Sequence, residues 1–508
     1  MLTGKILMEL YNTKRNHYVW FKEISWDLIV PLAFVVVILF FFPSKEQFEF
    51  STDEGLELMK ARLVAKGYSL YTDVWNDQPP VLTYLLVANM KVFGSDVLGA
   101  RYVVLFFSCV LIWAVSRILR MIWGNAHAIA GALLLLMLPQ YLILSVSVMR
   151  GLPAIAFAML SLYALLKWHD TRKYYWLIIS PVLLGLSVFT KLFTGFLAPI
   201  FLLGLVLFEY TRLENKTQWY KAITPAVIWG AVFGFAVLFL GVFLIGPQNI
   251  NQLVENHWLA EKTVASERHE YLTINWHLRN LIPFLFLAVV GTFAAFREKK
   301  WIVFYPFFWC ILAYGMLLFH YPVWDHHQHL ITIPAVILAA NAVVLAAKKV
   351  YQFVRNDFPL DAKKIMQLAA IAGLCAMFFR LPESLGVLKP SPSLSGTGLG
   401  LSLGKEKILY KMRNHAKNTH WVVTDLPMYA FRAGLSVPPN LAVISAKRIE
   451  TGLITGVDIL KTIRKYKPEQ ILLGRFKFPK LEIYLHKDYR VIVDTGNFRF
   501  YIRKPNGL

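Results

Sequence analysis

The sequence predicts a polytopic α-helical membrane protein of about eleven transmembrane helices, followed by a small C-terminal α/β domain. Three observations support this fold class. Hydrophobic residues make up 57% of the 508 residues and the mean hydropathy is +0.50, whereas soluble chains are about 45–50% apolar. Long apolar runs recur as far as residue 380, and Lys and Arg gather in alternate loops between them.

The apolar runs are close to the length of about 17–25 residues that a spanning helix needs. The first run follows a polar start that contains Lys and Arg, so we interpret it as a retained membrane anchor rather than a cleaved signal peptide. The expected spans are 26–43, 101–122, 127–146, 152–168, 175–190, 193–210, 222–246, 280–296, 301–319, 329–347 and 364–380.

The charge pattern predicts the orientation of these helices. Lys and Arg number 53 against 31 Asp and Glu, a net charge of +22. Because cytoplasmic loops carry surplus Lys and Arg, this excess does not call for a nucleic acid partner. We expect a multi-pass protein of the cell (inner) membrane with a cytoplasmic N-terminus and an extracytoplasmic C-terminal region. The basic loops contain Lys14, Arg15, Lys22, Arg117, Arg120, Arg172, Lys173, Arg212, Lys216, Lys221, Arg297, Lys299, Lys300, Lys348 and Lys349.

Composition divides the chain into a membrane core, a linker and a soluble domain. The core covers 1–380 and has a long outer loop at 44–100, and a Pro-, Gly- and Ser-rich linker covers 381–404. Helix-like and strand-like segments alternate over 405–508, where "YRVIVDTGNFRFYI" is typical of a hairpin. We find no phosphate loop or dinucleotide fingerprint in this domain.

Two adjacent acids, Asp53 and Glu54, follow the first apolar run in "FSTDEG". Ser51 and Glu54 have the spacing of a capping box, in which Ser51 accepts a backbone N–H and Glu54 reaches back to the cap. Asp53 is not needed for this motif, although the helix dipole favours any acid in a first turn. The pair is therefore either an ordinary helix start or part of a catalytic site.

A second polar run, "YTDVWNDQPPVLTYLL", lies further along the same outer loop. Asp73, Asp77 and Gln78 precede Pro79 and Pro80, which fix an extended approach to the next helix. The run is either a rigid polar loop or a substrate-binding wall that faces the first acids.

The third cluster, "WDHHQHL", lies at the outer end of a predicted span. Its histidines, His326 and His327, can bind an anionic substrate, and Asp325 with His329 could hold a divalent metal. The spacing matches no recognised metal motif, and a polar cap at the membrane interface is the alternative.

Several cations are also expected at outer helix ends. Snorkelling to the interface explains each of them singly, but together they could hold a phosphate near the membrane surface. These candidates are Arg101, Arg150 and Lys191, with His257 beside them.

The run from Asp53 to Arg101 resembles the first outer loop of the C-type (GT-C) membrane glycosyltransferases. "TDEG…GYSLYTDVWNDQPPVLTYLL…VFG…ARY" has the general shape seen in bacterial lipid A aminoarabinose transferases and protein O-mannosyltransferases. "SVFTKLFTG" and "WDHHQHLITIPA" resemble later segments of these families. The resemblance covers nearly the whole chain, and it is poorly specific for the substrate.

The resemblance implies that a sugar is transferred from a polyprenyl-phosphate carrier to a lipid, glycan or protein acceptor at the outer face of the bilayer. The acid pair Asp53 and Glu54 would be catalytic, with Asp53 as the general base of an inverting displacement. Cations would meet the phosphate that leaves, and Arg101, Lys191, His326 and His327 are the candidates.

Two departures concern phosphate binding. Aminoarabinose transferases carry a lysine before the proline pair, where this chain has Gln78, and an arginine soon after the acids, where it has Leu56 and Glu57. Other cations would then hold the phosphate, or a divalent metal would supply the charge. The departures also argue against aminoarabinose as the sugar.

Two other classes of function are open to the sequence. A transporter or lipid flippase would require ionisable residues within the spans, whereas the acids and histidines here gather in outer loops. A membrane-anchored binding protein would require only one helix to tether its domain. Both are less consistent with the sequence than an enzyme.

Overall fold

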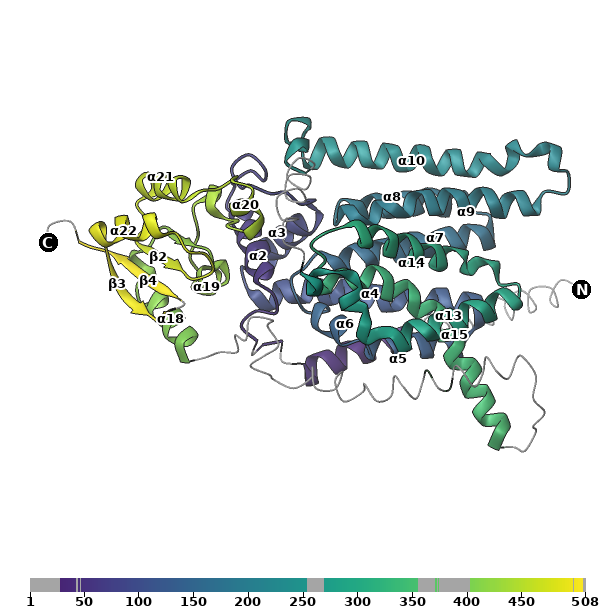
Figure 1. The fold of residues 1–508 in the computed structure, drawn as a ribbon. Helices are drawn as coiled ribbons and strands as arrows, with labels where there is room; N and C mark the ends of the chain where they lie inside the picture. The colour runs from purple at the N-terminus through teal and green to yellow at the C-terminus, as the bar shows by residue number, and fades with distance from the viewer. Residues whose placement is uncertain are drawn as a thin grey trace, which may run out of the picture.

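The computed structural model describes residues 28–42, 44–45, 47–253, 269–354, 371, 373, 403–496 and 498–505. It contains a bundle of long helices and a smaller unit with a β-sheet, which lies at one end of the bundle (Figure 1). We call residues 403–505 the C-terminal unit, and the end of the bundle that it covers the domain end.

Seven of the described helices, counted with the 3-10 turns that lead into them, are long and apolar enough to cross a membrane. They are α4 (Val97–Trp123), α7 (Gly151–Thr171), α9 (Leu197–Arg212), α10 (Tyr220–Leu244), α13 (Ile282–Arg297), α14 (Phe304–Phe319) and α15 (His329–Val354). Shorter apolar helices are Leu28–Phe41, α3 (Val81–Phe93), α5 (Asn125–Leu136) and α8 (Tyr174–Val188).

Ten of the eleven expected spans coincide with these helices, and the eleventh, 364–380, lies outside the described residues apart from 371 and 373. The expected helix 127–146 is wrong in one respect, because it is broken in two. α5 ends at Leu136, and α6 (Pro139–Leu144) begins at Pro139. Proline lacks a backbone N–H and fits the first turn of a helix better than its interior.

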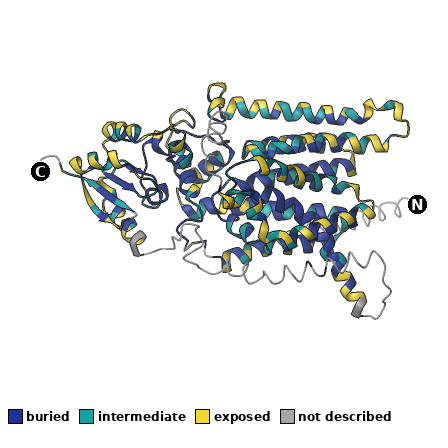
Figure 2. Ribbon diagram, in the orientation of Figure 1, coloured by how far each residue is buried: buried dark blue, intermediate teal, exposed yellow. Residues whose placement is uncertain are grey.

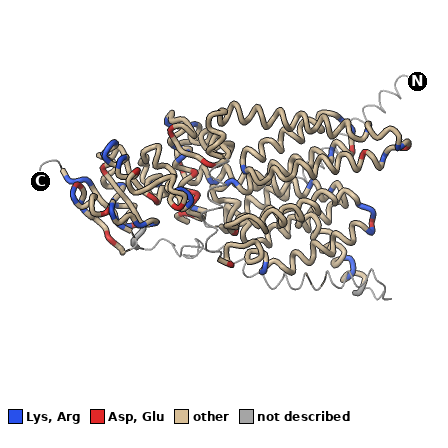
Figure 3. The backbone as a smooth tube through the Cα atoms, turned by 45° about the horizontal axis from the view of Figure 1, so that its top comes forward, with Lys and Arg blue, Asp and Glu red and all other residues tan. Residues whose placement is uncertain are grey.

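The outer surface of the bundle is apolar. On α10, Phe235, Phe239 and Phe243 are 70%, 48% and 71% exposed, and exposed and half-buried residues run along this peripheral helix (Figure 2). Charged residues are instead concentrated at the two ends of the bundle and in the C-terminal unit (Figure 3). This distribution fits helices that are surrounded by hydrocarbon.

The loop between the first helix and α4 contains α2 (Thr52–Ala65) and α3 at the domain end. As expected, Ser51 is the N-cap of α2, and its Oγ accepts the Asp53 N–H at 3.3 Å. α2 ends next to Gly67, whose positive φ of 99° is readily adopted by glycine.

The C-terminal unit has a four-stranded sheet in the order β1-β2-β4-β3. β1 and β2 are parallel, with Val423 opposite Ile471, and the other two pairs are antiparallel. The expected helices, strands and final hairpin are all present. The elements are α18 (Leu403–Asn414), β1 (Val422–Thr424), α19 (Pro427–Arg432), α20 (Ala446–Glu450), α21 (Gly456–Tyr466), β2 (Gln470–Leu473), α22 (Pro479–Asp488), β3 (Tyr489–Asp494) and β4 (Arg499–Arg503).

The C-terminal unit packs directly on the first loop, with α19 against α2. Arg62 donates to the Leu435 carbonyl at 3.0 Å and stacks 3.7 Å from the Phe431 ring centroid. At Gly55 the two backbones approach so closely that a Cβ would lie 2.6 Å from the Met428 nitrogen. α2 is therefore held between the membrane helices and the C-terminal unit.

We predict that Gly55→Ala separates this contact, because the added methyl group can be accommodated only by moving the backbone of Met428. Overpacking of this kind typically destabilises by about 1–3 kcal/mol. Thermal unfolding of the purified protein should show a lower midpoint, and limited proteolysis should release the C-terminal unit more readily. The matched control is Gly234→Ala in α10, where a Cβ would meet nothing within 4 Å.

Candidate active site

The two acids at the start of α2 have different environments, because consecutive residues of a helix point about 100° apart. Glu54 is 0% exposed. Its Oε1 accepts from Arg101 Nε at 2.9 Å and its Oε2 from Arg101 Nη2 at 2.8 Å. It also accepts hydrogen bonds from the backbone N–H groups of Phe50 and Val148. A capping box would instead have Glu54 accept the N–H of Ser51.

Arg101 lies on α4 and is 1% exposed, and its guanidinium N–H groups donate to atoms of the protein. Besides Glu54, it donates to the carbonyls of Ser44 at 2.6 Å and Gln47 at 2.9 Å, with a longer contact to Phe48 at 3.5 Å. The structure thus gives Glu54 and Arg101 a structural role, in place of the catalytic and phosphate-binding roles that the sequence suggested.

Asp53 lies on a different side of α2 and is exposed. Its carboxylate forms no hydrogen bond or ion pair with another described residue. Protein atoms nevertheless surround it, and this partial exclusion of water raises the pKa of Asp53, while Arg475, Arg150 and Lys60 oppose the shift. No described residue therefore holds the Asp53 carboxylate in place.

Glu57 and Lys60 follow Asp53 on the same face of α2, at the i+4 and i+7 positions. Glu57 Oε1 accepts from Lys60 at 2.9 Å and also from Arg150, which directly precedes α7. Lys60 Nζ donates further to Asn76 Oδ1 at 3.1 Å. Glu57 Oε2 is buried and has no hydrogen-bond partner among the described residues.

Lys191 lies between α8 and the 3-10 helix η1 (Leu192–Phe196). Burial, with a smaller contribution from Arg150, lowers the pKa of Lys191 to about 7, and Asp53 opposes the shift. Its only close partner among the described residues is the Phe193 ring, 5.6 Å from Nζ. Lys191 is therefore a cation without a carboxylate bonded to it, within electrostatic reach of Asp53.

The predicted histidines lie beside Lys191. The rings of His320 and His327 pack on Phe193 at 4.8 and 5.3 Å, and His326 packs on His327 at 4.4 Å. The Trp324 N–H donates to His327 Nδ1 at 3.3 Å, which leaves Nε2 as its second ring nitrogen. The structure thus brings Lys191, His326 and His327 together around the Phe193 ring.

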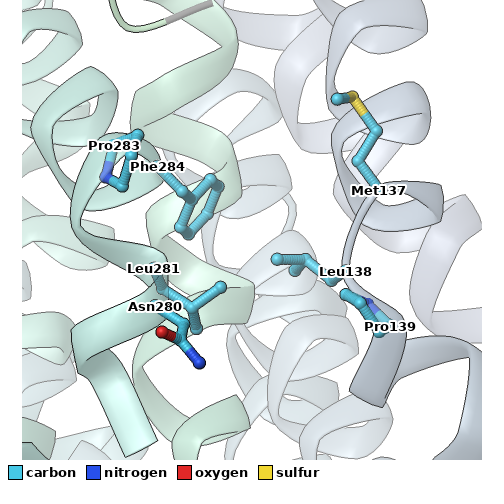
Figure 4. Close-up of a pocket in the computed structure, with 7 residues that line it drawn as sticks. All are labelled: Met137, Leu138, Pro139, Asn280, Leu281, Pro283 and Phe284. Atoms are coloured by element: carbon cyan, nitrogen blue, oxygen red, sulfur yellow. The ribbon is translucent and has the colours of Figure 1, made fainter. Parts of the chain in front are cut away.

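Asp325 and His329 instead line a separate cavity of about 280 Å³, together with Gln140, His277 and Arg279. Asp325 Oδ2 accepts from Gln140 at 2.8 Å. A smaller apolar pocket between the α5–α6 break and the start of α13 adjoins it (Figure 4). The mixed lining suits an amphipathic ligand. Within the part of the chain that the structure describes, no three His, Cys, Asp or Glu residues are arranged to hold a metal.

The remaining predicted residues have local roles or lie elsewhere. Asp73 is exposed and accepts the Ser69 N–H at 2.8 Å in a turn. Asp77 is 8% exposed and forms an ion pair with Lys447 of α20 at 2.8 Å. The Gln78 carbonyl accepts from Tyr71 and Asn76. His257 lies outside the described residues.

Sequence reasoning missed Glu57, Lys60 and Arg475. The i, i+4, i+7 spacing from Asp53 could have identified the first two, whereas Arg475 is more than 400 residues away in the chain. The group around Asp53 now contains two carboxylates, Asp53 and Glu57. Its four cations are Lys60, Arg150, Lys191 and Arg475. This surplus of positive charge favours an anionic ligand.

The fold and the site define a polytopic membrane protein whose exposed carboxylate lies among cations at one end of the helices. The family model of dolichyl-phosphate-mannose-protein mannosyltransferases matches residues 77–246. No protein of curated function matches the sequence significantly.

Two solved folds are similar to this one along most of the chain. For ArnT from Cupriavidus metallidurans in the apo state the TM-score is 0.61 at 14% identity, covering 94% of this chain and 98% of that chain. ArnT bound to undecaprenyl phosphate gives 0.59 at the same identity and coverage. For the Archaeoglobus fulgidus oligosaccharyltransferase in the apo form the TM-score is 0.56 at 13% identity, covering 89% of this chain and 70% of that chain. Together, the family match over residues 77–246 and these similar folds support the fold of the GT-C membrane glycosyltransferases that the sequence predicted.

We predict that Glu54→Gln destabilises the protein severely, because it leaves the buried guanidinium of Arg101 without its counter-charge. Breaking a buried ion pair in this way costs about 3–5 kcal/mol. Thermal unfolding in detergent should show a large drop in midpoint. Asp53→Asn is the matched comparison, one residue away, and should unfold close to wild type; equal losses in both variants would contradict the division of roles.

Proposed function

We propose that the protein transfers a sugar from a polyprenyl-phosphate-sugar donor to a lipid, glycan or protein acceptor, by inverting displacement with Asp53 as the general base. The observation that carries the proposal is the environment of Asp53. It is an exposed carboxylate that forms no hydrogen bond or ion pair with a described residue, and cations outnumber carboxylates around it. A transfer that takes up a proton and releases an anionic phosphate needs both features.

The chemistry follows from the charges. The acceptor oxygen attacks the anomeric carbon, its proton passes to the Asp53 carboxylate, and the bond from the anomeric carbon to the phosphate oxygen breaks. Polyprenyl phosphate leaves with the electron pair of that bond. Lys191 and Arg150 stabilise the developing negative charge, and His326 and His327 beside Lys191 can donate further hydrogen bonds.

Desolvation supports the role of Asp53 as a base. A carboxylate at a helix N-terminus is expected to have a low pKa and to be a weak base. Partial exclusion of water by the surrounding protein atoms raises the pKa of Asp53 instead, which strengthens it as a proton acceptor. The net direction therefore suits the proposed chemistry.

The bundle supports a domain end that faces away from the cytoplasm. The loops at the opposite end carry Arg172, Lys173, Arg297, Lys299 and Lys300, the surplus expected of cytoplasmic loops. With that orientation, Asp53 and the C-terminal unit meet substrates at the extracytoplasmic surface. The C. metallidurans relative was solved with undecaprenyl phosphate, which supports a lipid-linked donor of this kind.

We predict that Asp53→Asn lowers the rate of sugar transfer by about 10²–10⁴-fold, the usual contribution of a general base. The assay uses purified protein, polyprenyl-phosphate sugars and cell-envelope acceptors. Binding of the donor should change little, because the amide replaces a group that does not hold the phosphate. Asp170→Asn, an exposed acid at the far end of α7, is the control and should retain full activity. Wild-type turnover in Asp53→Asn would refute the assignment of Asp53 as the general base.

A second prediction concerns pH. Lys191 binds an anion only when protonated, and its pKa is about 7 in the free protein. Affinity for undecaprenyl phosphate should therefore fall about tenfold per pH unit above 7, relative to Lys191→Arg, whose guanidinium remains charged. The ratio of the two dissociation constants removes the titration of the ligand itself. A ratio that does not change between pH 7 and 9 would exclude Lys191 as a phosphate ligand.

A further inference from the structure

The C-terminal unit directs one loop toward the first acids. β1 and β2 are parallel neighbours, so their carboxyl ends meet at the same edge of the sheet. Asp425 directly follows β1, and residues 474–476 directly follow β2. Side chains that are far apart in sequence are therefore placed together at this edge, which is the usual location of ligand sites in open α/β sheets.

Asp425 holds the loop after β2. Its carboxylate, in a residue that is 1% exposed, accepts the backbone N–H groups of Gly474 at 3.0 Å, Arg475 at 2.8 Å and Phe476 at 2.8 Å. Three hydrogen bonds to one carboxylate fix the direction in which Arg475 leaves the backbone.

The surroundings of Asp425 disfavour its charged form. Burial raises the pKa of Asp425 to about 6, in spite of the three N–H donors. A raised carboxyl pKa means that the folded protein binds the proton more tightly than the unfolded chain, so stability falls as pH rises from about 4 to about 6. At neutral pH the group is ionised in spite of its burial, and the three N–H donors of the loop are its partners.

The guanidinium of Arg475 has unused hydrogen-bonding capacity. Its Nη1 is buried and has no hydrogen-bond partner among the described residues, and no described carboxylate forms an ion pair with it. Its only stacking partner there is the Phe476 ring, 5.1 Å from the guanidinium carbon. A buried N–H without a partner is costly, and a ligand atom would satisfy it.

Arg475 also acts on the catalytic carboxylate. Among the cations that oppose the raised pKa of Asp53, Arg475 has the largest effect, ahead of Arg150 and Lys60. The cation with the largest effect on the pKa of Asp53 therefore comes from the C-terminal unit rather than from the membrane helices. An arginine in this setting can bind a phosphate or carboxylate with two parallel hydrogen bonds.

We propose that Arg475 is a substrate-binding residue that the C-terminal unit contributes to the active site, where it binds an anionic group, and that Asp425 is its positioning residue. The proposal rests on the proposed function only in calling that ligand a substrate. The anionic group is either the phosphate of the donor or an acidic group of the acceptor, and the two share the chemistry that a guanidinium recognises.

The test measures binding to the full-length protein in detergent, without turnover. Two probes are used, undecaprenyl phosphate for the donor and inorganic phosphate for a free anion. Arg475→Gln should weaken binding by about 10–100-fold, the usual effect of losing a charge-assisted hydrogen bond. Loss with the lipid probe assigns Arg475 to the donor phosphate. Loss with inorganic phosphate alone assigns it to a separate anionic group of the acceptor. Unchanged affinity for both probes would overturn the proposal.

Control variants separate binding from folding. Arg490→Gln, an exposed arginine on β3, is the matched control and should bind both probes like wild type. Arg475→Lys keeps the positive charge but cannot form two parallel hydrogen bonds to one anion, so we expect about three- to tenfold weaker binding. If Arg475→Gln does not fold, Arg475→Lys replaces it as the test. Wild-type affinity for both probes in Arg475→Lys would then overturn the proposal.

A double-variant cycle tests Asp425. Asp425→Asn removes the charge and replaces one of the two acceptor oxygens that hold the loop with an N–H donor, so it should weaken binding of the same probe that Arg475→Gln affects. Asp425→Asn in the Arg475→Gln background should cause no further loss, because its effect acts through Arg475. Independent, additive losses would contradict positioning. If wild type transfers no sugar from any donor but still binds phosphate through Arg475, the proposed function fails and the anion site remains.

Discussion

The buried ion pair between Glu54 and Arg101 is the constraint on which the domain end depends. It joins the start of α2 to α4, and through Arg101 it also fixes the carbonyls of Ser44 and Gln47. Arg432 of the C-terminal unit donates to the same Gln47 carbonyl at 3.1 Å and to that of Phe48 at 2.8 Å. Two arginines, one from the bundle and one from the C-terminal unit, thus converge on one short segment. The position of α2, and of every residue on it, follows from that convergence.

Once α2 is fixed in position, its two faces have different roles. The face that carries Glu54 is turned into the protein, whereas Asp53, Glu57 and Lys60 are turned toward the cations of the site. Glu57 is shared between Lys60 and Arg150, and this sharing offsets part of the positive charge without engaging Asp53. The result is that Asp53, the proposed base, has no partner among the described residues and lies beside cations that another carboxylate holds in place. Pairing of Asp53 itself would have lowered its pKa and weakened it as a base.

Much of this could be predicted from local sequence, since hydrophobic runs, loop charge and turn residues act over short distances. The N-cap at Ser51 and the surplus acid at Asp53 are local features of this kind. The partner of Glu54 was not predicted, because a capping box explains a glutamate at that position equally well and the helix packing that brings Arg101 near is tertiary. For the same reason Arg101 could be mistaken for a phosphate ligand, and Asp77 gave no sign of its ion pair with Lys447, which lies 370 residues away. Pairings between distant segments need the fold.

The same limit explains why the site could be assigned only in part to the membrane helices. Lys191, His326 and His327 lie at helix ends, where apolar periodicity and charge reveal them. Arg475 lies in a loop of a soluble unit, and nothing in "LLGRFKFP" distinguishes it from a surface arginine. The parallel pairing of β1 with β2 brings Asp425 to that loop. The contact of α19 with α2 places the C-terminal unit against the helix that carries Asp53. A soluble unit that was merely tethered would not need to hold a guanidinium through a buried carboxylate in electrostatic reach of Asp53. Its packing on α2 therefore favours a C-terminal unit that acts as one wall of the site.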